Sequence, residues 1–322
     1  MRVRVAVNVP TMSFGLALGW VSLVSSQEGG DGGDGGDGSD GGAGLVLAAA
    51  TTFGASLLGV PLSALALRLG RKFAVIATSF AFIVCWSLKL VGGRWCVVVA
   101  RASAGLGAAG AWALSPLLAR EMCNARWRGA AASALVPAYN LGMLLMYLAA
   151  DWGLPQARVV SWCLGLSVAH CFLFMLMPES PAYLAASGKP EAAERSLRWL
   201  HGSPKSSAPL REGLAALPPP DLVAVSPFAL VKRMLGDRRR LRALLVGGFA
   251  VVGQEACGVL ALLQYAERVF ALALGGGGSA ERHAVLLGAA QLAASLGALY
   301  LVERLGRKVP ALPSSGPLYT FH

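Results

Sequence analysis

Charged side chains are scarce in this chain of 322 residues, in which Asp, Glu, Lys and Arg together make up 14%. An average globular protein carries roughly 25%. A soluble protein of this length needs more charges to cover its core with polar surface, and a disordered chain needs the opposite bias in composition. Apolar residues make up 55%, and the mean hydropathy is +0.58. The composition therefore predicts a chain that is solvated by lipid.

The sequence also lacks the usual patterns of metal-binding, disulfide-rich and catalytic proteins. Its six cysteines form no CxxC pair, and all but Cys123 lie in apolar runs, where a thiol is typically a small buried hydrophobe. Its four histidines form no ligand cluster, and there is no Ser/His/Asp set or HExxH motif. Residues 105–110 match GxGxxG, but inside an apolar run, where glycines are typical of close helix packing. We predict no metal site, no cofactor and no enzymatic activity.

Long apolar runs are what the chain has in abundance. A helix needs about 20 mostly apolar residues to cross a bilayer. The first candidate begins like a signal peptide, but polar Asn8 and Thr11 interrupt its apolar run, so we expect a retained helix. We predict eight spans, at residues 5–24, 44–67, 73–91, 95–119, 129–149, 159–177, 241–274 and 283–302.

The connections between these spans alternate in charge. Residues 27–42 hold five carboxylates in a repeating GGD pattern and no Lys or Arg, which predicts a flexible solvated loop rather than a calcium site. Basic residues recur on every second connection, and such loops stay in the cytoplasm, so both termini are predicted to be cytoplasmic. The arginine run 238–240 is compatible with binding to nucleic acid or anionic lipid, but directly before an apolar span it favours a cytoplasmic boundary.

The pattern predicts four regions. Residues 190–200 read as a short amphipathic helix that begins at Pro190, and 203–220 read as a linker. The regions are a six-helix transmembrane bundle at 1–177, a cytoplasmic linker with short amphipathic helices at 178–240, the first two helices of an incomplete second bundle at 241–308, and a tail at 309–322.

The string Arg-Leu-Gly-Arg-Lys occurs twice, at residues 68–72 and 304–308. Each copy ends the second predicted span of its half, so chance recurrence at matched positions is a poor explanation. Parallel repeats related by an axis along the membrane normal are the plan of major facilitator transporters. The duplication therefore indicates two related halves.

With these motifs in place, the chain resembles the sugar porters of the major facilitator superfamily, and in particular the arthropod facilitated trehalose transporters. The resemblance implies an all-helical polytopic membrane protein of the major facilitator fold. Family members have twelve spans and this chain has eight, so we expect a truncated copy. The residues that carry the resemblance to the sugar porters are Ser13 to Trp20, both RLGRK strings, Arg101, Gly105, Gly107, Pro116, Glu121, Arg128, Gly129, Pro178 to Pro181, Ala192 to Gly202, Gln254, Glu255, Gly258 and Tyr265.

The resemblance also implies a cytoplasmic gate of charged residues that join neighbouring helices in one transport state. Each ion pair forms in one state and is solvated in the other, so its energy biases the equilibrium between them. The gate residues carried over are Arg68, Gly70, Arg71, Lys72, Glu121, Arg128, Glu179, Glu303, Arg304, Gly306 and Arg307.

By the same resemblance, sugar is bound by side-chain amides near the midplane, because an amide is both donor and acceptor, as a hydroxyl is. The implied substrate-binding residues are Gln254, Glu255, Gln291 and Tyr265. Helix-to-helix hydrogen bonding is the alternative role for such amides. The chain departs from the family pattern where Glu255 replaces a glutamine, Leu260 an asparagine, Val136 a glutamine and Leu67 an acidic residue.

These residues lead to an expected function. We expect facilitated sugar transport, of trehalose or a hexose, by alternating access in the plasma membrane, with lipid as the surrounding partner and no nucleic acid. The first span has no acidic residue, which favours facilitated diffusion. Two alternatives stay open: a proton-coupled symporter that uses Glu255, and a transport-inactive membrane scaffold. The sequence leaves the oligomeric state open.

Overall fold

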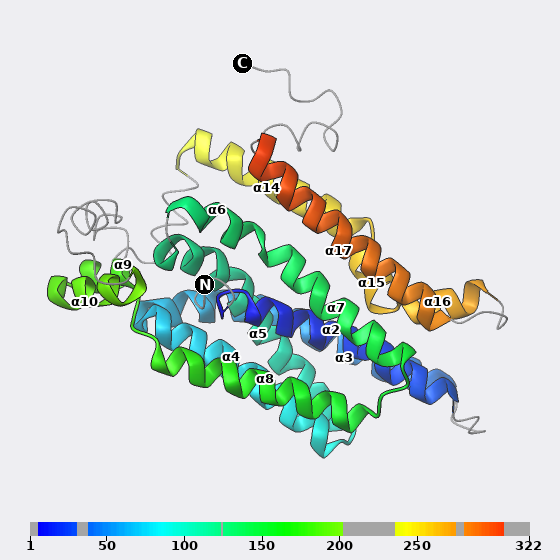
Figure 1. Ribbon diagram of the computed structural model, residues 1–322. Coiled ribbons are helices and arrows are strands. Elements are labelled where there is room, and N and C mark those ends of the chain that lie inside the picture. Colours follow the sequence, from blue (N-terminus) through cyan, green and yellow to red (C-terminus); the bar gives the residue numbers. More distant parts are fainter. Residues whose placement is uncertain (1–5, 31–37, 124, 202–235, 275–279, 306–322) are drawn as a thin grey trace.

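The computed structural model describes residues 6–30, 38–123, 125–201, 236–274 and 280–305. Throughout these residues the regular elements are helices, and Figure 1 shows most of them running roughly side by side as long rods. The helices are α2 (Val9–Gly30), α3 (Gly38–Leu69), α4 (Arg71–Val91), α5 (Arg94–Met122), α6 (Ala125–Ser133), α7 (Leu135–Asp151), α8 (Gln156–Leu176), α9 (Pro181–Ala186), α10 (Pro190–His201), α14 (Arg238–Ala256), α15 (Val259–Gln264), α16 (Ala266–Ala273) and α17 (Ala280–Leu305).

Six described helical stretches are long and apolar enough to cross a membrane, and α2 adds a shorter apolar stretch at Val9–Val24. Large hydrophobic side chains point outward, such as Leu57 at 77% and Trp162 at 62% exposed. On a soluble protein such a surface would be a large unexplained patch, whereas lipid covers it at no cost. The membrane-length stretches are Ala50–Leu69, Arg71–Val91, Trp95–Met122, Gly129–Asp151, Gln156–Leu176 and Ala280–Leu301.

Helices α2 to α8 form one bundle in which α5 packs against α3 and α4, α4 packs against α8, and α2 packs against α7. Helices approach closely where glycines remove the side chain. A Cβ atom on Gly15 of α2 would overlap the backbone of Tyr139 on α7, and one on Gly142 of α7 would overlap the backbone of Met12. Such contacts bring two backbones together in lipid, where hydrophobic driving force between helices is absent.

The GxGxxG stretch of α5 serves the same purpose. Gly105 lies against the backbone of Thr52 on α3, whereas Gly107 and Gly110 lie against Phe82 and Thr78 on α4. These glycines therefore sit at the contacts of α5 with two different neighbours, as close helix packing predicts.

The second part of the chain lies along one side of this bundle (Figure 1), with α17 against α7 and with α15 and α16 against α2. A shared core joins the two parts, in which Met143 and Tyr147 of α7 meet Leu263, Ala266 and Ala284. The Tyr147 hydroxyl donates a hydrogen bond to the carbonyl of Leu263. The parts are therefore held by buried apolar contacts and a polar anchor.

Two sequence expectations are wrong in detail. The span expected at 241–274 is not one helix, because α14 ends at Ala256, Gly258 adopts a φ of +70°, and Tyr265 separates α15 from α16. Glycine reaches this left-handed conformation at little cost and ends helices for that reason. The acidic loop expected at 27–42 is shorter, because α2 continues to Gly30 and α3 already begins at Gly38.

Two short helices follow the first bundle. Ser180 precedes α9 and its side chain accepts a hydrogen bond from the backbone N–H of Tyr183, while Pro181 occupies the first helical position. The amphipathic helix expected at 190–200 is confirmed as α10, which begins at Pro190. The linker expected at 203–220 and the tail at 309–322 lie outside the described residues.

Candidate functional site

The first RLGRK string places Arg71 at the start of α4, next to Glu121 in the last turn of α5. The Arg71 Nη2 atom lies 3.2 Å from Glu121 Oε1, and Arg71 Nε donates to both carboxylate oxygens at 3.2 and 3.3 Å. Only 11% of the Arg71 side chain and 8% of the Glu121 side chain is exposed. A further donor of the guanidinium, Nη1, reaches the carbonyl of Leu67 at 3.0 Å. This pair is thus a charge-assisted, multidentate contact shielded from solvent.

Helix α9 docks onto this ion pair. The Ser180 hydroxyl, which caps α9, donates to Glu121 Oε2 at 2.6 Å. The Tyr183 ring centroid lies 5.2 Å from the Arg71 guanidinium carbon, within cation–π range. The Tyr183 hydroxyl donates to the carbonyl of Arg68 at 3.0 Å. Three separate contacts therefore tie the start of α9 to the end of α3, the start of α4 and the end of α5.

Glu179 caps the other side of the same junction. Its Oε1 atom accepts hydrogen bonds from the backbone N–H groups of Lys72 at 2.9 Å and Ser180 at 2.8 Å. A carboxylate at the start of α4 satisfies an otherwise orphaned N–H group and complements the positive end of the helix dipole. The carbonyl of Glu179 accepts from Ser196 on α10 at 2.6 Å. Glu179 thereby links α4, α9 and α10.

Gly70 makes this approach possible. Its φ is +137°, in the region that favours glycine. A Cβ atom at this position would collide with Glu179 Oε2. We call the group of Arg71, Glu121, Glu179, Ser180 and Tyr183, with Gly70 at its centre, the RLGRK cluster.

Among the gate residues expected from sequence, the structure brings Gly70, Arg71, Lys72, Glu121 and Glu179 together. Arg68 is exposed and contributes its carbonyl, and Lys72 Nζ donates to the carbonyl of Met175 at 2.5 Å. Sequence reasoning gave Ser180 and Tyr183 no role, although a serine before a proline is a common helix-start signal. Arg128 lies on α6, and Glu303 and Arg304 lie on α17, with only their backbone described; Gly306 and Arg307 lie outside the described residues.

The residues expected to bind substrate lie in the second part of the chain. Gln291 is on α17, and its carbonyl accepts a hydrogen bond from Asn140 Nδ2 on α7 at 3.3 Å. The Gln291 Oε1 atom is buried and has no hydrogen-bond partner among the described residues. Tyr265 is half-buried between α15 and α16, while Gln254 and Glu255 lie near the end of α14, with only their backbone described.

Two further buried amides were missed in the sequence. Gln264 at the end of α15 is 3% exposed, and its Nε2 atom has no partner within the described part of the chain. Asn140 on α7 is 5% exposed. The available signal was an amide within an apolar run, which is costly to bury unless it is hydrogen-bonded. The family pattern has a glutamine at the position of Val136, and Asn140 lies one helical turn after that position.

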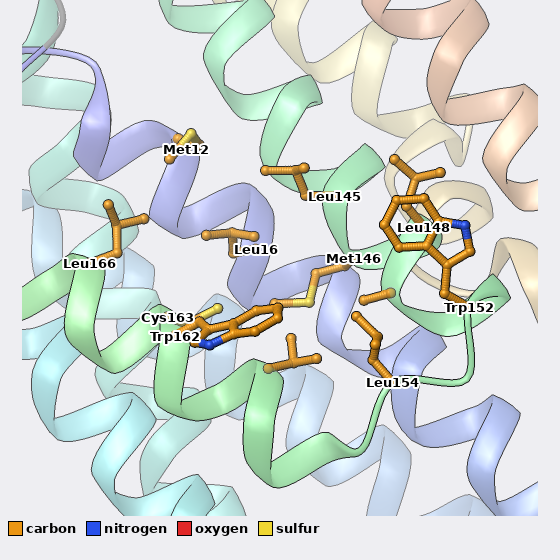
Figure 2. Close-up of a pocket in the computed structure, with 12 residues that line it drawn as sticks. Met12, Leu16, Leu145, Met146, Leu148, Trp152, Leu154, Trp162, Cys163 and Leu166 are labelled. Carbon is orange, nitrogen blue, oxygen red and sulfur yellow. The ribbon is translucent and has the colours of Figure 1, made fainter.

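A separate cavity of about 260 Å³ lies between α2, α7 and α8. Figure 2 shows it lined by apolar side chains, among them Leu16, Met146, Trp152, Leu154 and Trp162. It has no cluster of polar groups to receive hydroxyls. Its lining suits an apolar occupant rather than a sugar, and Gln264 and Gln291 are not part of it.

Comparison with known proteins decides the family. Residues 20–315 match the family model described as "Sugar (and other) transporter". This chain belongs to that family. The facilitated trehalose transporter Tret1 of Polypedilum vanderplanki is 26% identical over 250 residues, which cover 75% of this chain and 47% of that protein. The glucose transporter GlcP of Staphylococcus epidermidis is 24% identical over 250 residues, which cover 76% of this chain and 54% of that protein.

The fold of this sugar-transporter-family chain is that of the major facilitator superfamily. The xylose transporter XylE from E. coli, in a partially occluded inward-open conformation, matches with a TM-score of 0.70 at 20% identity, over 95% of this chain and 74% of that chain. A second structure, titled as the major facilitator superfamily proton:xylose symporter XylE, matches at 0.66 and 22% identity, over 96% of this chain and 71% of that chain. The chain spans about half the length of the curated relatives described above. The chain is therefore a multi-pass membrane protein, and it belongs to the sugar transporter family that its sequence motifs resemble.

Proposed function

We propose that this chain is a facilitative sugar transporter for trehalose or a hexose, which works by alternating access in the plasma membrane with both termini cytoplasmic. Family membership and the relatives that transport trehalose and glucose support this proposal. The observation that carries it is the RLGRK cluster. It joins α4, α5, α9 and α10 at one end of the bundle through contacts that a rigid-body movement would have to break.

The cluster suits a role in a two-state switch. Because its ion pair is shielded from solvent, removing either partner leaves an uncompensated buried charge, which costs more than the loss of an exposed pair. Opening that end of the bundle would expose Glu121 and Glu179 to water, which solvates the separated charges at modest cost. Arg128 belongs to the same half of the proposed gate as the RLGRK cluster, and Glu303, Arg304 and Arg307 are the second half's members. The balance between the closed and opened arrangements sets the population of each transport state.

The proposed sugar site lies where α7 faces the second part of the chain. The side-chain amides of Gln291 and Gln264 can offer a buried acceptor, Gln291 Oε1, and a buried donor, Gln264 Nε2, neither of which has a partner among the described residues. Sugar hydroxyls would pair with both kinds of group, and Gln254, Glu255 and Tyr265 complete the proposed set. Leaving such groups unpaired in the substrate-free protein is an expected cost of a binding site.

Reconstitution of the full chain into liposomes tests the proposal. We expect influx of radiolabelled trehalose or glucose that saturates with concentration and is competed by the unlabelled sugar but not by its mirror image. Empty liposomes and liposomes with the Gln291→Ala variant are the controls. An influx no faster than that of empty liposomes would contradict transport and support the scaffold alternative.

The same liposomes separate facilitated diffusion from proton coupling. We expect the initial influx to be indifferent to an imposed pH gradient and the Glu255→Gln variant to retain transport. An influx driven by inward protons and abolished in Glu255→Gln would instead establish the symporter alternative.

A further inference from the structure

Two cations are buried side by side within the first bundle, away from the RLGRK cluster. Lys89 on α4 is 5% exposed and Arg101 on α5 is 4% exposed. Neither forms an ion pair with a carboxylate among the described residues. Burying an unpaired charge is costly, and buried cations are therefore normally paired with an anion. The first bundle holds two such charges together, and their mutual repulsion adds to the cost of burying each one.

Aromatic rings account for part of the environment of Lys89. Its Nζ atom lies 4.1 Å from the ring centroid of Trp20 and 4.3 Å from that of Trp86. The Arg101 guanidinium carbon lies 5.8 Å from the Trp20 ring. Such contacts stabilise a cation through the ring quadrupole. They do not supply a hydrogen-bond acceptor or a compensating negative charge.

Donors without acceptors gather at this place. The Arg101 Nε, Trp20 Nε1 and Trp86 Nε1 atoms are all buried and have no hydrogen-bond partner in the described part of the chain. Trp20 is 5% exposed and Trp86 is fully buried. Each of these groups can only donate. Lys89 has the Cys85 thiol as a hydrogen-bond partner but no carboxylate beside it, and the three N–H donors have no acceptor among the described residues.

We propose that Lys89, Arg101, Trp20 and Trp86 form a binding site for a small monovalent inorganic anion of the chloride class. An anion here would accept the unused hydrogen bonds and compensate the repulsion between the two cations. Burial of all four side chains restricts the occupant to a small ion that loses its hydration readily. The double positive charge and the indole donors favour an anion over water.

The site lies toward the end of α4 that is opposite to the RLGRK cluster. Lys89 follows Arg71 by 18 residues along α4, which corresponds to about 27 Å along the helix axis. Tyr265 of the second part of the chain is among the titratable groups near Arg101. The anion would therefore lie beside the boundary between the two parts, where its occupancy stabilises their packing.

Thermal unfolding of the purified full chain in detergent tests this site. Chloride replaces gluconate at constant ionic strength, so that general screening stays fixed. We expect a rise in melting temperature that saturates with chloride, because a ligand bound only by the folded state stabilises it. A melting temperature that is the same in chloride and gluconate would overturn the proposal.

Variants locate the effect. For Lys89→Gln and Arg101→Gln we expect the chloride concentration at half-maximal stabilisation to rise about tenfold or more, from the loss of one charged hydrogen bond. Lys189→Gln, which changes an exposed lysine before α10, is the matched control and should keep the wild-type midpoint. Equal midpoints in all three variants would show that the Trp cage alone accommodates the two cations.

A second measurement, fluorescence quenching, tests the site without substituting Lys89 or Arg101. Bromide quenches indole fluorescence, and an anion bound between Trp20 and Trp86 would quench it saturably at low concentration. We expect this saturable component to shrink in Trp20→Phe and to persist in Trp162→Phe, which changes an exposed indole on α8. Quenching of the wild-type chain that rises without saturation would reflect collisions only and would also overturn the proposal.

Discussion

The guanidinium of Arg71, at the first residue of α4, lies 3.2 Å from the carboxylate of Glu121 in the last turn of α5. The contact joins residues 50 positions apart in the sequence, and α9 adds the Ser180 hydroxyl to the same carboxylate. The relationship shows how one short string controls an end of the bundle. Arg71 supplies the charge, and its neighbour Gly70 leaves room for the second carboxylate at Glu179.

Removing the charge of Glu121 should destabilise the protein. In Glu121→Gln the Arg71 guanidinium keeps little solvent access and loses its counter-charge, which we expect to cost about 1–3 kcal/mol. Thermal unfolding in detergent measures the loss. Glu194→Gln breaks the exposed contact with Arg198 on α10, and it should cost roughly 0.5 kcal/mol or less. Equal losses in the two variants would contradict a special role for the shielded pair.

Gly70→Ala should be costly for two separable reasons. The new Cβ atom would face a φ of +137° and collide with the Glu179 carboxylate. The control is Gly188→Ala, where φ is +72° but no atom lies near the added Cβ. We expect about 1–2 kcal/mol from conformation alone in the control and a larger loss in Gly70→Ala. A smaller loss at Gly70 than at Gly188 would argue against the carboxylate contact.

Gly142→Val should separate α2 from α7. The valine side chain would overlap the backbone of Met12 and Leu16, whereas Gly165→Val on α8 adds the same side chain where nothing lies nearby. We expect overpacking to cost about 1–3 kcal/mol or more at Gly142 and little at Gly165. Melting temperatures of the two variants, compared in the same detergent, measure this difference. Tolerance of valine at Gly142 would show that α2 and α7 are not in close contact.

Gln291→Ala should weaken sugar binding if the proposed transport function holds. The loss of one buried amide that pairs with a sugar hydroxyl predicts about a tenfold rise in the half-saturating sugar concentration. Ser161→Ala is the control, because that hydroxyl bonds only to its own helix at Ala157. Concentration-dependent influx into liposomes gives both values. An unchanged half-saturating concentration with a lowered melting temperature would assign Gln291 to helix packing instead.

Local sequence patterns predicted much of the fold correctly. Uninterrupted apolar stretches predicted the spans at α4, α5 and α8 and the helix at Pro190, because length and hydropathy are properties of consecutive residues. The break at Gly258 was not predicted, because the surrounding run is apolar throughout and a single glycine is tolerated within many helices. The extensions of α2 to Gly30 and α3 from Gly38 were missed because glycine and aspartate are weak helix formers.

The candidate site was predictable in part. The repeated string pointed to Arg71 and the family resemblance to Glu121, but neither pointed to Ser180 and Tyr183 as their partners. Gln264 and Asn140 were overlooked because an amide in an apolar run has no directional signature. The partner of such an amide is another helix, a ligand or an ion, and the packing of the surrounding helices decides which of these it is.

The sequence by itself determined that this is a chain of lipid-exposed helices, since hydropathy and charge alternation are readable residue by residue, and its RLGRK repeat predicts two related halves. Only the tertiary structure decided that Glu179 caps the start of α4, that Gly15 and Gly142 bring α2 onto α7, and that Lys89 and Arg101 share one buried environment between indoles. The physical reason is that burial and hydrogen-bond partnership depend on distances between residues far apart in the chain. A helix presents several faces of similar composition, and packing selects the one that becomes a site.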